Sequence, residues 1–197
     1  ITSLDHDHFD TYPALSDYKA AFRSFMEQSD MTLLWEREMR YLELGHEDVN
    51  SEAYDETREL DHITLVGDHN RHNAYLVERA CYILFPDRSH LEVGAALNSF
   101  PGTARRFEKL TDGIYSDYAH HPSEIAATLQ MASEVSPDVV AVYQPHQNIR
   151  QHDVRDLYTD SFIKAQEVYW LPTYLSREDP ALPILSPEDL IAKLENV

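Results

Sequence analysis

The chain has 197 residues, with 16 Lys or Arg against 35 Asp or Glu, which gives a formal net charge of -19 at pH 7. Hydrophobic residues make up 43% of the sequence, enough for a packed core, so global disorder is excluded. The single cysteine excludes an intramolecular disulfide and a cysteine-rich zinc site. No apolar run approaches the roughly 20 residues of a membrane span, and the acidic balance repels phosphate. We therefore expect neither a membrane nor nucleic acid as a partner.

The first half of the chain is expected to contain amphipathic helices, because apolar residues recur at helical spacing after Ser16 and again after residue 70. Residues 31–44 fit a strand or a helix, and the acidic stretch after them predicts a surface excursion. The expected elements are the end of a buried strand at 1–4, helices at 16–28, 70–85 and 90–99, a short strand at 63–66 and the excursion over 45–61. The helix at 70–85 would bury a face made of Ala74, Val77, Cys81 and Leu84.

The second half alternates short apolar runs with amphipathic segments. Phe-Pro-Gly-Thr at 100–103 predicts a turn and a domain boundary. The expected elements are strands at 114–115, 139–143 and 167–171 and helices at 123–134, 153–165 and 187–194. Strands that alternate with helices at this spacing are typical of an α/β fold with a parallel sheet.

Three of the expected strands are followed by loops that contain histidine. These loops carry His6 and His8, then Asp117, His120 and His121, then His146 and Arg150. Since ligands bind beyond the carboxyl ends of parallel strands, we expect the three loops to meet at one sheet edge. The aspartates around His6 and His8 suit a metal ion, although their spacing is a weak metal signal. Each loop by itself is explained equally well as solvated surface.

Two further segments offer groups that could bind a nucleotide. Gly67 leads into a helix whose first N–H groups could face an anion. Asn70 and Asn73 share one face of the first turn, where two amides can bind the edge of a base. Arg105 and Arg106 present planar guanidinium groups suited to phosphate. The alternatives are helix capping by Asn70 and a surface ion pair between the arginines and the nearby Glu108.

Taken together, these segments resemble the Mur ligase family in their order and spacing. The resemblance covers nearly the whole chain and is weakest over residues 30–62. It is carried by Gly-Asp-His-Asn-Arg-His-Asn at 67–73, Phe-Pro-Gly-Thr-Ala-Arg-Arg-Phe-Glu at 100–108, Asp-Tyr-Ala-His-His-Pro-Ser-Glu at 117–124, Gln-Pro-His at 144–146 and the opening segment at 1–12.

The resemblance implies an α/β fold with part of a central ATP-binding domain at 1–100, followed by a Rossmann-like C-terminal ligase domain with a mostly parallel sheet at 101–197. It implies an ATP- and Mg²⁺-dependent ligase that joins L-alanine to UDP-N-acetylmuramate through an acyl phosphate, for peptidoglycan precursor synthesis in the cytoplasm. The oligomeric state stays open.

The resemblance also implies roles for particular residues. His8 would hold Mg²⁺, and Asn70 and Asn73 would read the adenine. The implied nucleotide and catalytic residues are Arg105 and Arg106 at the ATP phosphates, Asp117 at the ribose, His120 near the nucleotide and the acceptor amine, and His146 and Arg150 on the amino-acid side.

The sequence departs from the family pattern at two places. It contains no Gly-Lys-Ser or Gly-Lys-Thr phosphate loop, which we expect upstream of Ile1 in a longer protein, so this piece alone should be inactive. Gln147 stands after Gln-Pro-His where the alanine-adding enzymes usually have arginine, which leaves the acceptor amino acid open.

Three alternative functions remain at this point. One is a recycling ligase that attaches a whole peptide to UDP-N-acetylmuramate, although Arg105-Arg106 and Gln-Pro-His at 144–146 favour the alanine-adding branch. A second is a non-catalytic nucleotide-binding descendant of the same scaffold. The third, a histidine-rich metal-binding protein, rests only on the 11 histidines in the chain.

Overall fold

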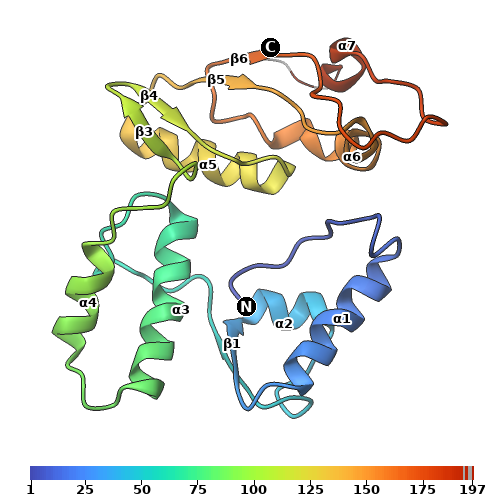
Figure 1. The fold of residues 1–197 in the computed structure, drawn as a ribbon. Coiled ribbons are helices and arrows are strands. Elements are labelled where there is room, and N and C mark those ends of the chain that lie inside the picture. Colours follow the sequence, from blue (N-terminus) through green and yellow to red (C-terminus); the bar gives the residue numbers. More distant parts are fainter. Residues whose placement is uncertain (193, 195–196) are drawn as a thin grey trace. The chain divides into compact units, whose positions relative to one another are not determined.

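The computed structural model describes residues 1–192, 194 and 197 (Figure 1). The chain divides into two compact units, each described by itself below. The first unit comprises Ile1–Leu65 and His69–Phe100, and the second comprises Val66–Asp68 and Pro101–Val197. Among the described residues, no helix combines the length and apolar character that crossing a membrane requires. The assignment of residues 1–100 and 101–197 to an ATP-binding and a ligase domain stays a prediction.

The first unit combines helices with one small parallel sheet. Its elements are α1 (Leu15–Glu27), β1 (Thr32–Trp35), α2 (Glu36–Leu42), β2 (Ser51–Tyr54), α3 (Asp68–Leu84) and α4 (His90–Asn98). β1 and β2 run parallel, in a register that pairs Thr32 with Ser51 and Trp35 with Tyr54. Because successive strand residues point to opposite faces, Leu34 and Trp35 enter different apolar clusters. Both side chains are fully buried, so β1 joins the two halves of this core.

The second unit contains two further two-stranded sheets. Its elements are β3 (Glu108–Thr111), β4 (Ile114–Ser116), α5 (Pro122–Val135), β5 (Val140–Tyr143), α6 (Asn148–Val154), the 3-10 helix η1 (Arg155–Asp160), β6 (Glu167–Trp170) and α7 (Pro187–Ile191). β3 and β4 form an antiparallel hairpin, whereas β5 and β6 are parallel. The aromatic side chains that pack beside β5 and β6 have ring centroids 4.9 to 6.2 Å apart; they are Tyr143, Tyr158, Phe162 and Trp170.

The predicted α/β class is confirmed, with corrections to individual elements. Residues 1–4 and 63–66 form no strand, although Ile63 is buried. Residues 31–44 contain both a strand and a helix, and the expected surface excursion includes β2. The helix expected at 153–165 begins earlier, as α6, and continues as η1.

The predicted apolar face of α3 was also wrong. Ala74 is buried, but Val77 and Leu84 are 48% and 68% exposed, and Cys81 is half-buried. The buried residues of this helix are instead Ala74, Tyr75, Leu76 and Glu78. Tyr75 packs on Trp35 at a ring-centroid distance of 5.5 Å. The helix therefore turns its aromatic side toward the core of its own unit.

Substituting Gly67 by alanine should destabilise the chain strongly. Gly67 has φ +90°, and an added Cβ would lie 2.9 Å from Cβ and Sδ of Met131. Gly102 has a similar φ of +87° but open space around it. In urea unfolding we expect Gly67→Ala to lower the free energy of unfolding by roughly 2–5 kcal/mol, from strain and overpacking together. Gly102→Ala should cost about 1–2 kcal/mol from strain alone. Equal losses for the two variants would contradict the close packing at Gly67.

Candidate functional site

The first unit carries three of the predicted site residues, and His8 lies in its N-terminal segment. His8 has a left-handed backbone with φ +59°, and its carbonyl accepts the N–H groups of Thr11 and Tyr12, each at 2.8 Å. Its Nε2 lies 3.8 Å from Oδ2 of Asp7, and its side chain is 66% exposed. The turn thus presents an imidazole next to a carboxylate, both reachable from solvent.

Asn70 and Asn73 lie three residues apart near the start of α3, both half-buried, and so share one side of that helix. The turn before them differs from expectation. The N–H of Gly67 donates to Oε2 of Glu134 at 3.0 Å, and the N–H of Asp68 donates to Oε1 of Gln130 at 2.9 Å. These two N–H groups are bonded to side chains of α5 and do not face an anion, whereas the expectation for the following N–H groups of the helix stays a prediction.

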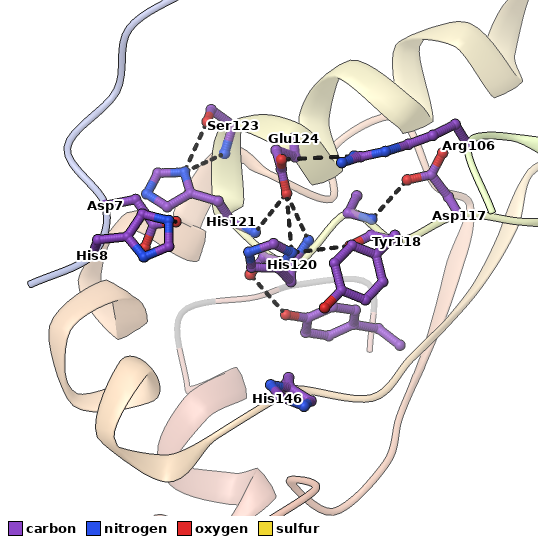
Figure 2. Close-up of polar contacts among 12 residues, drawn as sticks. Asp7, His8, Arg106, Asp117, Tyr118, His120, His121, Ser123, Glu124 and His146 are labelled. Atoms are coloured by element: carbon purple, nitrogen blue, oxygen red, sulfur yellow. Dashed lines mark hydrogen bonds and ion pairs between the residues drawn. The ribbon is translucent and has the colours of Figure 1, made fainter. Parts of the chain in front are cut away.

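In the second unit, the carboxylate of Glu124 in the first turn of α5 gathers the polar groups of the preceding loop (Figure 2). Its Oε2 accepts the backbone N–H groups of His120 at 3.0 Å and His121 at 3.3 Å. Its Oε1 lies 3.8 Å from Nη1 of Arg106. His121 adds a second cap, because its Nδ1 accepts the N–H of Ser123 at 3.4 Å. One carboxylate therefore caps a helix and fixes both a histidine and an arginine.

Arg105 and Arg106 form an exposed turn beside an aromatic ring. Their guanidinium carbons lie 4.6 and 5.8 Å from the ring centroid of Tyr118, within cation–π range. Arg105 and the nearby Phe107 have left-handed φ angles of +60° and +49°. Glu108 does not pair with the guanidinium groups as the alternative reading expected. Its carboxylate accepts the backbone N–H of Arg105 at 2.8 Å.

Asp117 secures that turn to the loop of His120. Its Oδ2 accepts the N–H of Phe107 and its Oδ1 accepts the N–H of Ala119, both at 2.7 Å. Each carboxylate oxygen can accept a second hydrogen bond. The side chain therefore supports the loop and still has acceptor capacity for a hydroxyl group.

The ring of His120 has a defined tautomer. Its Nδ1 lies 3.0 Å from the carbonyl oxygen of Tyr118 and 3.3 Å from Oε2 of Glu124. Because a carbonyl oxygen can only accept, Nδ1 carries the proton, and the neutral ring has its lone pair on Nε2.

His146 lies after β5 and stacks on Tyr174, with ring centroids 5.3 Å apart and planes 20° apart. Burial lowers its pKa below the usual value of 6.5, and the positive charge of Arg150 lowers that pKa further. The charge of His120 makes a further, smaller contribution that lowers the pKa of His146. The neighbouring Gln147 has a left-handed φ of +64°, and its N–H donates to the carbonyl of Tyr174 at 2.9 Å.

The expectation that three histidine loops meet at one sheet edge was wrong. Residues 1–4 form no strand, and β4 belongs to an antiparallel hairpin rather than to the sheet of β5. The loops of His120 and His146 are linked by a hydrogen bond and not by a shared sheet edge. The hydroxyl of Tyr143, at the end of β5, donates to the carbonyl of His120 at 3.3 Å. Within residues 1–192, 194 and 197, no three His, Cys, Asp or Glu side chains are grouped to hold a metal ion by themselves.

Sequence reasoning missed Glu124, Tyr118 and Tyr174 as parts of this arrangement. A signal existed for Glu124, since it lies three residues after His121 at the start of a predicted helix, the spacing of a capping box. No comparable pattern marks the two tyrosines, because their roles depend on ring positions.

Sequence comparison identifies close relatives, although no protein-family model matches the chain. It is 31% identical to UDP-N-acetylmuramate–L-alanine ligase of Streptococcus equi subsp. zooepidemicus, over 99% of this chain and 51% of that protein. It is 32% identical to the protein of the same name from Lactiplantibacillus plantarum, over 100% of this chain and 52% of that protein. The chain thus spans about half the length of the curated relatives it matches. Their alignments cover 227 and 228 positions, so these relatives carry residues in the matched region that this chain lacks.

Two solved structures share the fold. UDP-N-acetylmuramate–alanine ligase MurC from Thermotoga maritima matches with a TM-score of 0.63 and 23% identity, over 88% of this chain and 45% of that one. A murein peptide ligase from Psychrobacter arcticus matches with a TM-score of 0.53 and 18% identity, over 86% of this chain and 42% of that one. These matches extend across both units and agree with the α/β class.

Removing the charge of Arg150 should raise the pKa of His146. The wild-type imidazole should titrate below pH 6.5, because burial and Arg150 both disfavour its protonated form. In Arg150→Ala the pKa should move upward without reaching the usual value, since the burial remains. An NMR titration of the His146 ring measures both values. The control variant Arg155→Ala removes a positive charge from the exposed start of η1 and should leave the pKa of His146 unchanged. An unchanged pKa of His146 in Arg150→Ala would contradict the electrostatic account.

Proposed function

We propose that this chain belongs to the Mur ligase family and is part of an ATP-dependent ligase of peptidoglycan precursor synthesis, because it is similar throughout its length to about half of the length of UDP-N-acetylmuramate–L-alanine ligases. The whole-length similarity is the observation that carries this proposal. The complete protein would join L-alanine to UDP-N-acetylmuramate in the cytoplasm. This chain, which spans about half the length of those relatives, should be inactive by itself.

The proposed reaction has two balanced steps. A carboxylate oxygen of UDP-N-acetylmuramate attacks the γ-phosphorus of ATP, forming an acyl phosphate and releasing ADP. The amine of L-alanine then attacks the acyl carbon, the bond from that carbon to the phosphate oxygen breaks, and inorganic phosphate leaves. The ammonium form of the amino acid must first lose a proton, so the second step needs a group that accepts one.

Each unit carries polar groups that would bind a part of the nucleotide. Asn70 and Asn73 would bind the adenine edge with amides on one side of α3. Asp117 would accept a ribose hydroxyl with its remaining lone pairs. Arg105 and Arg106 would bind the phosphates and neutralise the charge that develops during phosphoryl transfer. The side chain of Arg106 is more than half exposed and so open to such a ligand. The stacking of both arginines on Tyr118 restricts their motion before the nucleotide arrives.

The residues around His8 fit a hydrated Mg²⁺ ion. Mg²⁺ usually keeps several waters and takes one or two protein ligands beside substrate phosphates. The accessible imidazole of His8 and the carboxylate of Asp7 3.8 Å away supply such a partial donor set, and the carboxylate is the better ligand by charge and hardness. When bound, the ion would neutralise phosphate charge.

The acceptor amine would bind near the histidines of the second unit. His146 is held neutral by burial and by Arg150, so it can accept the proton that the ammonium group loses. His120 offers Nε2 as a further acceptor. Arg150 would bind the carboxylate of the amino acid as a planar donor. These roles are part of the proposal.

An assay of phosphate release with different amines should separate this proposal from its alternatives, and two variants should test the role of Arg106. We would assay phosphate release by the protein encoded by the complete reading frame, with ATP, Mg²⁺ and UDP-N-acetylmuramate. L-Alanine, glycine, L-serine and a tripeptide would be added separately, because Gln147 leaves the acceptor open. Release that depends on L-alanine is expected. Arg106→Ala should lower kcat on the order of 10²-fold, the usual effect of removing one electrostatic donor.

Lys109→Ala is the matched control, since the Lys109 side chain is as exposed as that of Arg106 and its ion pair within the described part of the chain is with the nearby Asp112, at 2.7 Å. It should keep wild-type kcat. Release that requires the tripeptide would identify a peptide ligase instead. A folded protein that binds ATP but releases no phosphate with any amine would be a non-catalytic descendant.

A further inference from the structure

A chain of buried hydrogen bonds joins the loops of His120 and His146. Nε2 of Gln151 donates to the carbonyl of His146 at 3.2 Å, and the hydroxyl of Tyr158 donates to Oε1 of Gln151 at 2.7 Å. The hydroxyls of Tyr158 and Tyr143 lie 3.1 Å apart, and that of Tyr143 lies 3.3 Å from the carbonyl of His120. Gln151 is fully buried, Tyr158 is 1% exposed and Tyr143 is 8% exposed.

These polar atoms are not needed to fill the core. Phe162 packs in the same aromatic cluster without a hydroxyl group. Burying a hydroxyl or an amide is unfavourable unless it is hydrogen-bonded, so phenylalanine at either tyrosine would be the simpler packing solution. What the three side chains add is a bonded path between two backbone carbonyls, those of His120 and His146.

We propose that Gln151, Tyr158 and Tyr143 are positioning residues that hold His120 and His146 in fixed relation for the amine-transfer step. The roles of the two histidines rest on the proposed function, whereas the connection between their loops rests on the hydrogen bonds alone. None of the three side chains touches the reacting atoms in this account. Each acts through the backbone of a histidine.

The two ends of this hydrogen-bonded path differ in strength, because there are fewer hydroxyl protons than contacts between oxygen atoms. Three oxygen–oxygen contacts share two hydroxyl protons, and burial keeps both protons in place by raising the pKa of Tyr143 to about 12 and that of Tyr158 further. The shortest contact assigns the Tyr158 proton to Gln151. The Tyr143 proton must then serve both Tyr158 and the carbonyl of His120, so the His120 end is held more weakly.

The two tyrosine variants therefore have different expected effects. Tyr143→Phe removes the bond to His120 and leaves the path from Tyr158 through Gln151 to His146. Tyr158→Phe leaves Oε1 of Gln151 without its donor, which loosens the amide that holds His146. It also frees the Tyr143 proton for the carbonyl of His120.

Steady-state kinetics and amide hydrogen exchange on the complete protein test this assignment together. Losing one hydrogen bond typically changes an equilibrium by about three- to tenfold. We expect Tyr158→Phe to raise KM for L-alanine by about that factor and to speed exchange at 146–148, without speeding exchange at 119–121. We expect Tyr143→Phe to speed exchange at 119–121 and to lower kcat by a similar factor, with a smaller effect on KM for L-alanine.

Tyr169→Phe is the matched control, because it removes a hydroxyl from a tyrosine on β6 that is 53% exposed. It should change neither readout. If the wild-type enzyme is active and both core variants keep its KM and kcat, the positioning role is overturned. If the wild type shows no ligase activity, the proposed function fails, and exchange alone decides whether the path holds the two loops; unchanged exchange in both variants would overturn the inference.

Discussion

The carboxylate of Glu124 sets the geometry of the second unit's candidate site. It lies in the first turn of α5, where the helix dipole and unpaired N–H groups favour a negative charge. The N–H groups of His120 and His121 and the guanidinium of Arg106 all meet it (Figure 2). A rigid helix thus supports a loop that would otherwise adopt many conformations. The other contacts of the site, including the support of the arginine turn by Asp117, extend from this loop.

The charge distribution explains why the site needs concentrated arginines. With a net charge of -19, the chain as a whole repels ATP and a uridine nucleotide. Binding such anions requires local positive groups whose positions are fixed. Arg105 and Arg106 are held over the ring of Tyr118, and Arg150 lies near His146. Burial lowers the pKa of His146 and the charge of Arg150 lowers that pKa further, so in the proposed reaction Arg150 would bind an anionic group and also favour the neutral imidazole.

Sequence patterns predicted the long elements well and the short strands poorly. The helices α1, α3 and α5 begin within two residues of the predicted positions, because apolar spacing is a local signal and, in α5, a capping box adds to it. β2 is half-buried throughout and β3 is mostly exposed, so neither shows the apolar alternation that marks a strand. Residues 1–4 and 63–66 were predicted as strands but form none. Their apolar side chains reflect burial, as at Ile63, but they pair with no strand.

The sequence offered candidate site residues but not their arrangement. The motif containing Asp117 and His120 pointed to candidate side chains, whereas the tautomer of His120 depends on the carbonyl of Tyr118 and on Glu124. The link between the His120 and His146 loops runs through side chains at 143, 151 and 158, whose spacing matches no single helix or strand. Such links arise from tertiary packing, and local sequence carries little of that information.

Transfer of an isotope from the carboxylate to phosphate tests the central claim most directly. UDP-N-acetylmuramate labelled with ¹⁸O in its carboxylate would be incubated with the complete protein, ATP, Mg²⁺ and L-alanine. Mass spectrometry of the released phosphate would then show whether it carries the label. An acyl-phosphate ligase must release phosphate that contains one oxygen from the substrate carboxylate. Phosphate that contains no label, released while ATP is consumed, would mean that water attacks ATP directly and would contradict the ligase account.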